Sequence, residues 1–190
     1  MSNDIEIETK QLLNKEQYLI IKKEILNHKH TKINQVNYYF ETDDYYFKNN
    51  NQALRIRVYD DKYEICLKTR ANIINYESNY LISKDEFESI KKDTSLFSKY
   101  FNDIPRNIKL LGSLNTIRIE YKINKGLICL DYSTYFNKED YEIEFEANNL
   151  KDKYYLKEYL NSLNIEFIEN KITKIERFSN ELKLISNRAY

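Results

Sequence analysis

Most of this chain alternates between apolar and polar residues with a period of two, the spacing of a β-strand that buries one face. The alternation predicts about eight strands, over residues 4–10, 35–41, 53–59, 62–70, 76–83, 116–124, 127–133 and 140–147. Helical periodicity predicts helices over residues 14–27, 83–92, 91–101, 150–163 and 171–185. With no linker or repeat between these segments, the pattern predicts one α+β domain over residues 1–190.

Two of the predicted helices carry sequence signals for their first turn. Asn14 is a good N-cap for the helix that follows it. Ser83, with Glu86 three residues later, is a capping-box signature. These signals favour helices that begin at fixed positions and cover the apolar faces of the strands.

The composition excludes several classes of function. The 2 glycines, Gly112 and Gly126, cannot form a Walker A loop or a dinucleotide-binding loop, so side chains must bind any phosphate. The 30 basic and 30 acidic residues balance, which disfavours a nucleic-acid partner. No apolar run is long enough to span a membrane, and residues 1–10 lack the features of a secretory signal. Two cysteines, Cys66 and Cys129, fit a reduced, cytoplasmic setting.

The charged faces of the strands are sorted by sign. Glu142, Glu144 and Glu146 share one strand face without a cation among them, whereas Arg55 and Arg57 lie together on another. A sheet or sandwich with its charges in water is the ordinary interpretation, but such a face usually mixes signs because like charges repel. Sorted charges favour an eight-stranded antiparallel closed β-barrel with a charged interior, flanked by amphipathic helices.

A charged interior of this kind suits a bound polyphosphate. Several carboxylates in a confined space need cations, and oxygen-only clusters suit Mg²⁺ or Mn²⁺. Clustered Arg and Lys need an anion, and Arg offers forked donors to phosphate oxygens. Metal, cations and enclosure together favour phosphoryl transfer.

The order of the charged motifs resembles one family. Glu6, Glu8 and Lys10 form Glu-x-Glu-x-Lys, which is similar to the hallmark of the CYTH superfamily, the triphosphate tunnel metalloenzymes. Further resemblances follow in the family's order at residues 35–42 (QVNYYFET), 54–57 (LRIR), 66–69 (CLKT), 116–118 (TIR), 130–133 (LDYS), 140–146 (DYEIEFE) and 173–178 (TKIERF, with Thr in place of the family's Ser). The match spans about residues 5–178 and most resembles the short bacterial single-domain members.

The resemblance implies a set of site residues and a divalent metal, Mg²⁺ or Mn²⁺. The implied metal ligands are Glu6, Glu8, Asp131, Glu142, Glu144 and, with a less secure role, Glu146. The implied triphosphate ligands are Lys10, Arg55, Arg57, Lys68, Arg118, Lys174 and Arg177. Lys68 and Glu120 are the residues that could assist the attacking water. The implied activity is hydrolysis of inorganic or nucleoside triphosphate with release of phosphate.

Several alternatives stay open at the level of sequence. An adenylyl cyclase would use the same fold, with a ribose hydroxyl in place of water, but no adenine pocket is identifiable. A non-catalytic polyphosphate or nucleotide sensor would need fewer carboxylates. His28 and His30 form a short H-x-H in a polar turn, where zinc is a poor interpretation because no cysteine accompanies them. Cys66 and Cys129 are expected to be packing thiols, not nucleophiles.

Overall fold

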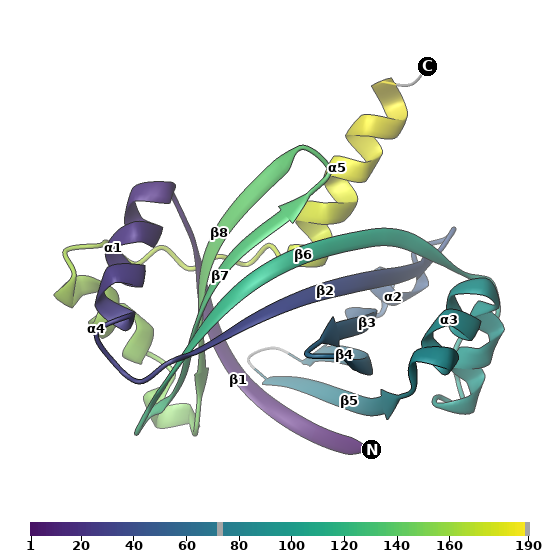
Figure 1. Cartoon of the computed structure of the whole chain (residues 1–190), viewed down its shortest axis with the longest axis horizontal. Coiled ribbons are helices and arrows are strands. Elements are labelled where there is room, and N and C mark those ends of the chain that lie inside the picture. The colour runs from purple at the N-terminus through teal and green to yellow at the C-terminus, as the bar shows by residue number, and fades with distance from the viewer. Residues whose placement is uncertain (72–73, 189–190) are drawn as a thin grey trace. The chain divides into compact units, whose positions relative to one another are not determined.

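The fold was analysed in a computed structural model, which describes residues 1–71 and 74–188 (Figure 1). Its eight strands form a closed barrel in the order β1-β5-β4-β3-β2-β6-β7-β8. The strands are β1 (Ser2–Leu13), β2 (Thr31–Thr42), β3 (Gln52–Tyr59), β4 (Lys62–Ala71), β5 (Ile74–Ile82), β6 (Ile108–Ile123), β7 (Gly126–Tyr135) and β8 (Lys138–Ala147). The pairs β1–β8, β2–β3, β3–β4, β4–β5, β6–β7 and β7–β8 run antiparallel. The predicted α+β barrel is confirmed.

The helical elements connect the strands or follow the last one. They are α1 (Lys15–Ile25), α2 (Tyr46–Asn49), α3 (Lys84–Lys92), η1 (Thr94–Lys99), η2 (Leu150–Asp152), α4 (Tyr155–Ser162) and α5 (Lys174–Arg188). Both predicted first turns are confirmed, because Asn14 and Ser83 each complete a capping box, with Gln17 and Glu86 respectively. No helix among the described residues is long and apolar enough to cross a bilayer.

Several elements differ from the sequence prediction. The helix predicted over 171–185 is α5, from Lys174 to Arg188, and the helix predicted over 150–163 is η2 followed by α4. Strands β2 and β6 begin earlier, at Thr31 and Ile108, where polar residues interrupt the alternation. The second short helix predicted over 91–101 is a 3-10 turn, which starts after Asp93 caps the amide of Ser95. The short helix α2 was not predicted. It is held by Glu41, whose carboxylate accepts hydrogen bonds from the amides of Phe47 and Lys48.

The chain forms two compact units, each with its own apolar core. The first consists of Met1–Ile5 and Gln35–Leu114, and the second of Glu6–Asn34 and the chain from Asn115 onward. In the first unit, outward residues of β2, β3 and β4 pack against α3 and η1. This core contains Phe40, Phe47, Leu54, Ile56, Ile65, Phe87, Ile90, Phe97 and Ile108.

In the second unit the core lies between the apolar faces of β6, β7 and β8 and the helices α1 and α4. It contains Ile119, Ile128, Leu130, Ile143 and Phe145 from the strands, all buried. Their neighbours along each strand are the charged residues, which occupy the opposite face because side chains alternate. The apolar residues are therefore covered by helices, as predicted, and the charged residues face the other side of the sheet.

Candidate functional site

Strand register in the second unit aligns the charged residues into rows. Arg118 on β6 lies opposite Asp131 on β7, which lies opposite Glu142 on β8. In the next row, Cys129 lies opposite Glu144, which lies opposite Lys10 on β1. These rows bring side chains from four strands onto one face.

Three carboxylates of these rows form a buried cluster. Asp131, Glu142 and Glu144 are only 0%, 1% and 8% exposed. One oxygen of each lies within 4.8 Å of the others, a spacing at which three carboxylates can share one cation. The set offers oxygen ligands alone, which suits a hard divalent cation. The cluster therefore fits the implied metal.

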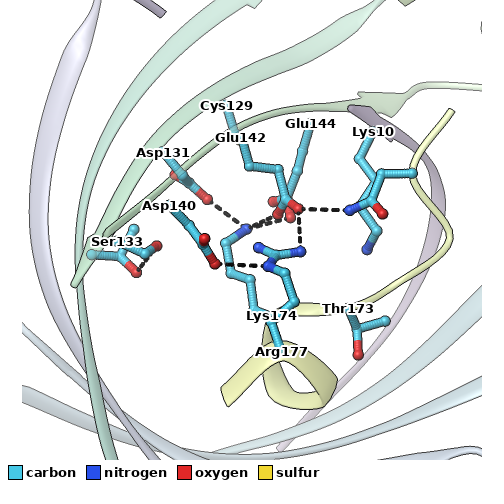
Figure 2. A network of polar contacts seen from close by, with 12 residues as sticks. Lys10, Cys129, Asp131, Ser133, Asp140, Glu142, Glu144, Thr173, Lys174 and Arg177 are labelled. Carbon is cyan, nitrogen blue, oxygen red and sulfur yellow. Dashed lines mark hydrogen bonds and ion pairs between the residues drawn. The ribbon is translucent and has the colours of Figure 1, made fainter. Parts of the chain in front are cut away.

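Two cations from different elements bind this cluster, and Figure 2 shows one of them, Lys174, pointing at Asp131, Glu142 and Glu144. The Nζ atom of Lys174, the first residue of α5, lies 2.9 Å from Asp131 and 2.5 Å from Glu144, and it also contacts Glu142. Arg118 donates two 2.8 Å hydrogen bonds to the two oxygens of Asp131, and its Nη2 lies 2.5 Å from Glu144. The forked contact of Arg118 fixes the orientation of Asp131.

The start of α5 is fixed by a local cap and by contacts with distant strands. Thr173 and Glu176 cap each other, since the amide and hydroxyl of Thr173 donate to the Glu176 carboxylate and the amide of Glu176 donates to the Thr173 hydroxyl. Asn170 donates its backbone amide to the carbonyl of Lys10 and its side chain to Glu142. The segment before α5 is thus tied to β1 and β8, and Lys174 is placed at the carboxylates.

Arg177 lies one turn further along α5 and binds the acidic face as well. Its Nε donates to Asp140 at 2.8 Å and its Nη1 to Glu142 at 2.9 Å. Tyr135 also donates its hydroxyl to Asp140, at 2.7 Å. The predicted cations Arg118, Lys174 and Arg177 are therefore all on the acidic cluster.

The burial of this cluster and its charges act on the pKa values in opposite directions. Burial disfavours the charged form of Asp131, but Arg118 and Lys174 outweigh it and lower the pKa of Asp131. The same balance, with Lys174 and Arg118 as cations, holds the pKa of Glu144 well below its ordinary value. Burial prevails at Glu142, whose pKa is raised although Lys174 opposes the shift. The cluster thus carries more negative charge than burial alone would allow.

The remaining predicted metal ligands lie outside this group of three. Glu8 is paired with Lys10 at 2.6 Å, and its side chain is 9% exposed. Glu146 lies 3.7 Å from Arg118. Glu6, further toward the start of β1, is half-buried. Among the described residues, the grouping close enough to share a cation contains Asp131, Glu142 and Glu144 without these three.

In the first unit the cations and carboxylates alternate on one face of β3, β4 and β5. Arg57 lies opposite Glu64 and 3.8 Å from it, while Lys68 lies opposite Glu77 and 3.3 Å from it. Arg55 lies 3.6 Å from Glu77. The predicted cations of this unit, Arg55, Arg57 and Lys68, therefore share one face, as the alternation required.

Glu77 is a buried carboxylate that the sequence analysis missed. Burial favours its protonated form, but Arg55, Lys68 and Arg57 outweigh burial and lower the pKa of Glu77 to about 2. Glu77 therefore stays ionised and keeps the two nearest cations in place. Asp140 and Asn170 were missed as well. The sequence could have indicated Glu77 and Asp140 by their position in the alternation, because each lies on the same strand face as predicted site residues.

Glu120, predicted as an assistant to the attacking water, lies on β6 opposite Cys129. It is half-buried, and within the described parts of the chain it makes no hydrogen bond or ion pair. A carboxylate without such partners is a chemically suitable proton acceptor.

The histidines and cysteines do not form a second centre among residues 1–71 and 74–188. His28 stacks on Tyr121 and contacts Glu24, while the Nδ1 of His30 contacts the carbonyl oxygen of His28. Burial raises the pKa of the Cys66 thiol to about 11 and that of Cys129 well above its usual range. Both thiols are buried, which fits packing and makes them poor nucleophiles.

The barrel has helices over its apolar face, and carboxylates paired with cations along the other face. These features define a class of barrel proteins lined by acidic and basic side chains. The chain belongs to the CYTH domain family, whose model matches residues 4–179. The resemblance noted from the sequence is confirmed.

Individual relatives agree with this assignment. The chain is 36% identical over 162 residues to a Bacillus subtilis (strain 168) protein named "Putative triphosphatase YjbK", covering 77% of this chain and 80% of that protein. A crystal structure from Bacillus halodurans, of a protein described as a "putative adenylate cyclase", is 31% identical, with a TM-score of 0.82 over 94% of this chain and 99% of that one. A Hippeastrum protein, described as a "putative adenylyl cyclase" with a dominant triphosphatase activity, shares the fold at 20% identity and a TM-score of 0.76, over 93% and 95% of the two chains.

Proposed function

We propose that this chain is a divalent-metal-dependent triphosphatase that releases phosphate from inorganic triphosphate or a nucleoside triphosphate. The observation that carries the proposal is the buried triad of Asp131, Glu142 and Glu144, held at cation-sharing distance. Three buried carboxylates are costly to fold, so their retention favours a role in binding a cation. The 36% identical relative bears the name of a triphosphatase.

The proposed metal is Mg²⁺ or Mn²⁺, held by Asp131, Glu142 and Glu144. Bound there, it would neutralise and polarise phosphoryl oxygens. Glu6 and Glu8 on β1 and Glu146 on β8 are proposed as further acidic ligands. Lys10, paired with Glu8, is proposed to orient that carboxylate or a phosphate.

The proposed triphosphate ligands are the seven cations that the family resemblance implies. They are Lys10, Arg55, Arg57, Lys68, Arg118, Lys174 and Arg177. Arginine suits this role because its planar fork matches phosphate oxygens. Glu77 and Glu64 already pair with Arg55 and Arg57 on the strand face, at 3.6 and 3.8 Å. Pre-ordering of this kind lowers the entropic cost of binding a polyanion.

Lys68 and Glu120 are proposed to assist the attacking water. Glu120 can accept a proton directly because no cation occupies it among the described residues. Lys68, whose Nζ lies 3.3 Å from Glu77, would stabilise negative charge on the phosphoryl group. The two roles differ, so Glu120→Gln should change the pH dependence of the rate more than Lys68→Met does.

The test is release of phosphate from tripolyphosphate with Mg²⁺ or Mn²⁺. Glu144→Ala and Arg57→Ala should each lower the rate at least tenfold, because a charge-assisted contact contributes about 1.5–3 kcal/mol. Lys109→Ala is a matched control, since Lys109 forms an exposed pair with Asp43. Activity that survives both site substitutions contradicts the proposal.

A cyclase activity is the second candidate, and the 31% identical Bacillus halodurans structure favours it by its description. In that reaction the ribose 3′-hydroxyl of ATP attacks in place of water. Formation of cyclic AMP and pyrophosphate from ATP, in place of phosphate, decides for the cyclase. Triphosphate-dependent thermal stabilisation with neither product identifies a sensor. We further propose a cytoplasmic location, which the two buried free thiols support.

A further inference from the structure

A cavity lies in the second unit, on the apolar side of the strands. It has a volume of about 490 Å³, within the range of roughly 300–1,000 Å³ that is typical of small-molecule sites. One wall is a single face of α1, formed by Lys15, Tyr18, Leu19, Lys22 and Leu26 at helical spacing. The opposite wall consists of residues of β6, β7 and β8 that point away from the acidic cluster.

The strand side of this cavity is aromatic. Tyr132 and Tyr141 stack with ring centroids 5.3 Å apart and planes 23° apart, and Tyr18 packs on Tyr141 at 4.9 Å. On the rim, Leu19 and Leu26 are 51% and 47% exposed. Flat rings and exposed apolar side chains together favour a ligand with a planar apolar part.

The charge of the lining is positive. Lys15, Lys22 and Lys32 all line the cavity, and its one carboxylate is Glu139. The two oxygens of Glu139 are already occupied, because Tyr132 and Tyr141 each donate a hydroxyl hydrogen bond of 3.1 Å to it. The three ammonium groups therefore exceed the single carboxylate and favour an anionic ligand.

We propose that this cavity binds a small planar aromatic anion, of the class of nucleoside monophosphates, apart from the acidic cluster. The ring lies against Tyr132 and Tyr141, and the anionic group binds the lysines. The site is distinct because Tyr132 and Tyr141 alternate along their strands with Asp131 and Glu142, which face the other side of the sheet. The proposal does not depend on the triphosphatase activity.

The test is isothermal titration of the full chain with AMP in low-salt buffer containing EDTA. One AMP should bind per chain, and adenosine and inorganic phosphate should each bind at least tenfold more weakly, because each has only half of the required chemistry. Titration with 4-hydroxybenzoate tests whether the site prefers an aromatic phosphate, such as AMP, or an aromatic carboxylate. Weaker binding than AMP supports a phosphate ligand, whereas tighter binding overturns the nucleotide assignment.

Neighbouring lysines of α1 give a matched pair of variants. Lys22→Glu should weaken AMP binding at least tenfold, whereas Lys23→Glu, the same change at an exposed position outside the lining, should leave it within about twofold. Lys32→Glu, at an exposed position of β2, repeats the first change on another element. Circular dichroism verifies that each variant folds.

Three outcomes overturn the proposal. The first is absence of AMP binding to the wild-type chain at millimolar ligand. The second is equal weakening by Lys22→Glu and Lys23→Glu, which indicates unspecific attraction. The third is loss of AMP binding in Arg57→Ala, which would assign the ligand to the cationic face of the first unit. Failure of phosphate release from tripolyphosphate, in contrast, leaves this proposal untouched.

Discussion

The ammonium group of Lys174 lies 2.9 Å from the carboxylate of Asp131 and contacts Glu142 and Glu144 as well. A helix residue thus supplies the counter-charge for carboxylates carried by two strands, β7 and β8. The three carboxylates raise the pKa of Lys174 well above its ordinary value although burial opposes this shift. A divalent cation that uses the same carboxylate oxygens has to compete with this ammonium.

Replacing Lys174 should change metal affinity and stability in opposite directions. Lys174→Met should bind Mn²⁺ about tenfold more tightly than the wild type because the competing charge is gone. Without metal, the same variant should be destabilised by about 3 kcal/mol or more, because the buried carboxylates lose a partner. Electron paramagnetic resonance of free Mn²⁺ measures the first effect, and thermal melting with and without Mn²⁺ measures the second.

The matched control for this variant is Lys171→Met, at an exposed position just before α5. It should change neither Mn²⁺ affinity nor stability appreciably. Weaker Mn²⁺ binding by Lys174→Met than by Lys171→Met contradicts the competition between lysine and metal.

Arg118 should be a major contributor to the stability of the second unit. Arg118→Met removes the forked contact to fully buried Asp131 and should lower the free energy of unfolding by about 3–5 kcal/mol. Arg118→Lys keeps the positive charge but not the forked pair of donors. Its free energy of unfolding should therefore lie between those of the wild type and Arg118→Met. Urea unfolding compares both with Lys122→Met, an exposed position on the same strand. If Arg118→Met and Lys122→Met have equal free energies of unfolding, the forked contact does not stabilise the second unit.

Glu77 should stabilise the first unit through Arg55 and Lys68. At pH 7, Glu77→Gln should lower the free energy of unfolding by about 3 kcal/mol, because two cations lose a buried partner. Glu169→Gln, at an exposed position of the second unit, provides the control in urea unfolding. If both variants unfold like the wild type, Glu77 does not hold these cations.

The same residue gives the stability a defined dependence on pH. The pKa of Glu77 is lowered to about 2 from an ordinary value of 4.5, so the folded state favours its ionised form. Its contribution is therefore complete above about pH 5 and is lost as the pH falls toward 2. Urea unfolding from pH 7 to pH 2.5 should show wild-type stability approaching that of Glu77→Gln. A constant difference across this range argues against the lowered pKa.

The sequence predicted the barrel well because its signal is local. Alternation along each strand determines which residues share a face, and Arg118, Asp131 and Glu142 share a row as soon as their strands pair. The strand of Glu77 has weak alternation, with exposed Tyr76 beside it, so the buried role of Glu77 was not visible.

The placement of α5 depends on contacts between distant segments, which a local pattern cannot reveal. Lys174 and Arg177 are three residues apart on a helix, a spacing more typical of a solvated face, and only the family resemblance implied a site there. The structure explains their position by Asn170, which bonds the carbonyl of Lys10 and the carboxylate of Glu142. Helix α2 was missed for a different reason, because its amides are bound by Glu41 of the preceding strand, six and seven residues away, and not by a capping residue just before the helix.

The most direct measurement is ³¹P nuclear magnetic resonance of tripolyphosphate incubated with the purified chain. With Mg²⁺ or Mn²⁺ present, the wild type should convert each tripolyphosphate into one pyrophosphate and one phosphate, and EDTA should stop the reaction. Glu142→Gln should reduce the rate at least tenfold, because one of the three buried carboxylates loses its charge. Hydrolysis that continues in EDTA, or at an unchanged rate in Glu142→Gln, contradicts a metal-dependent triphosphatase centred on this cluster.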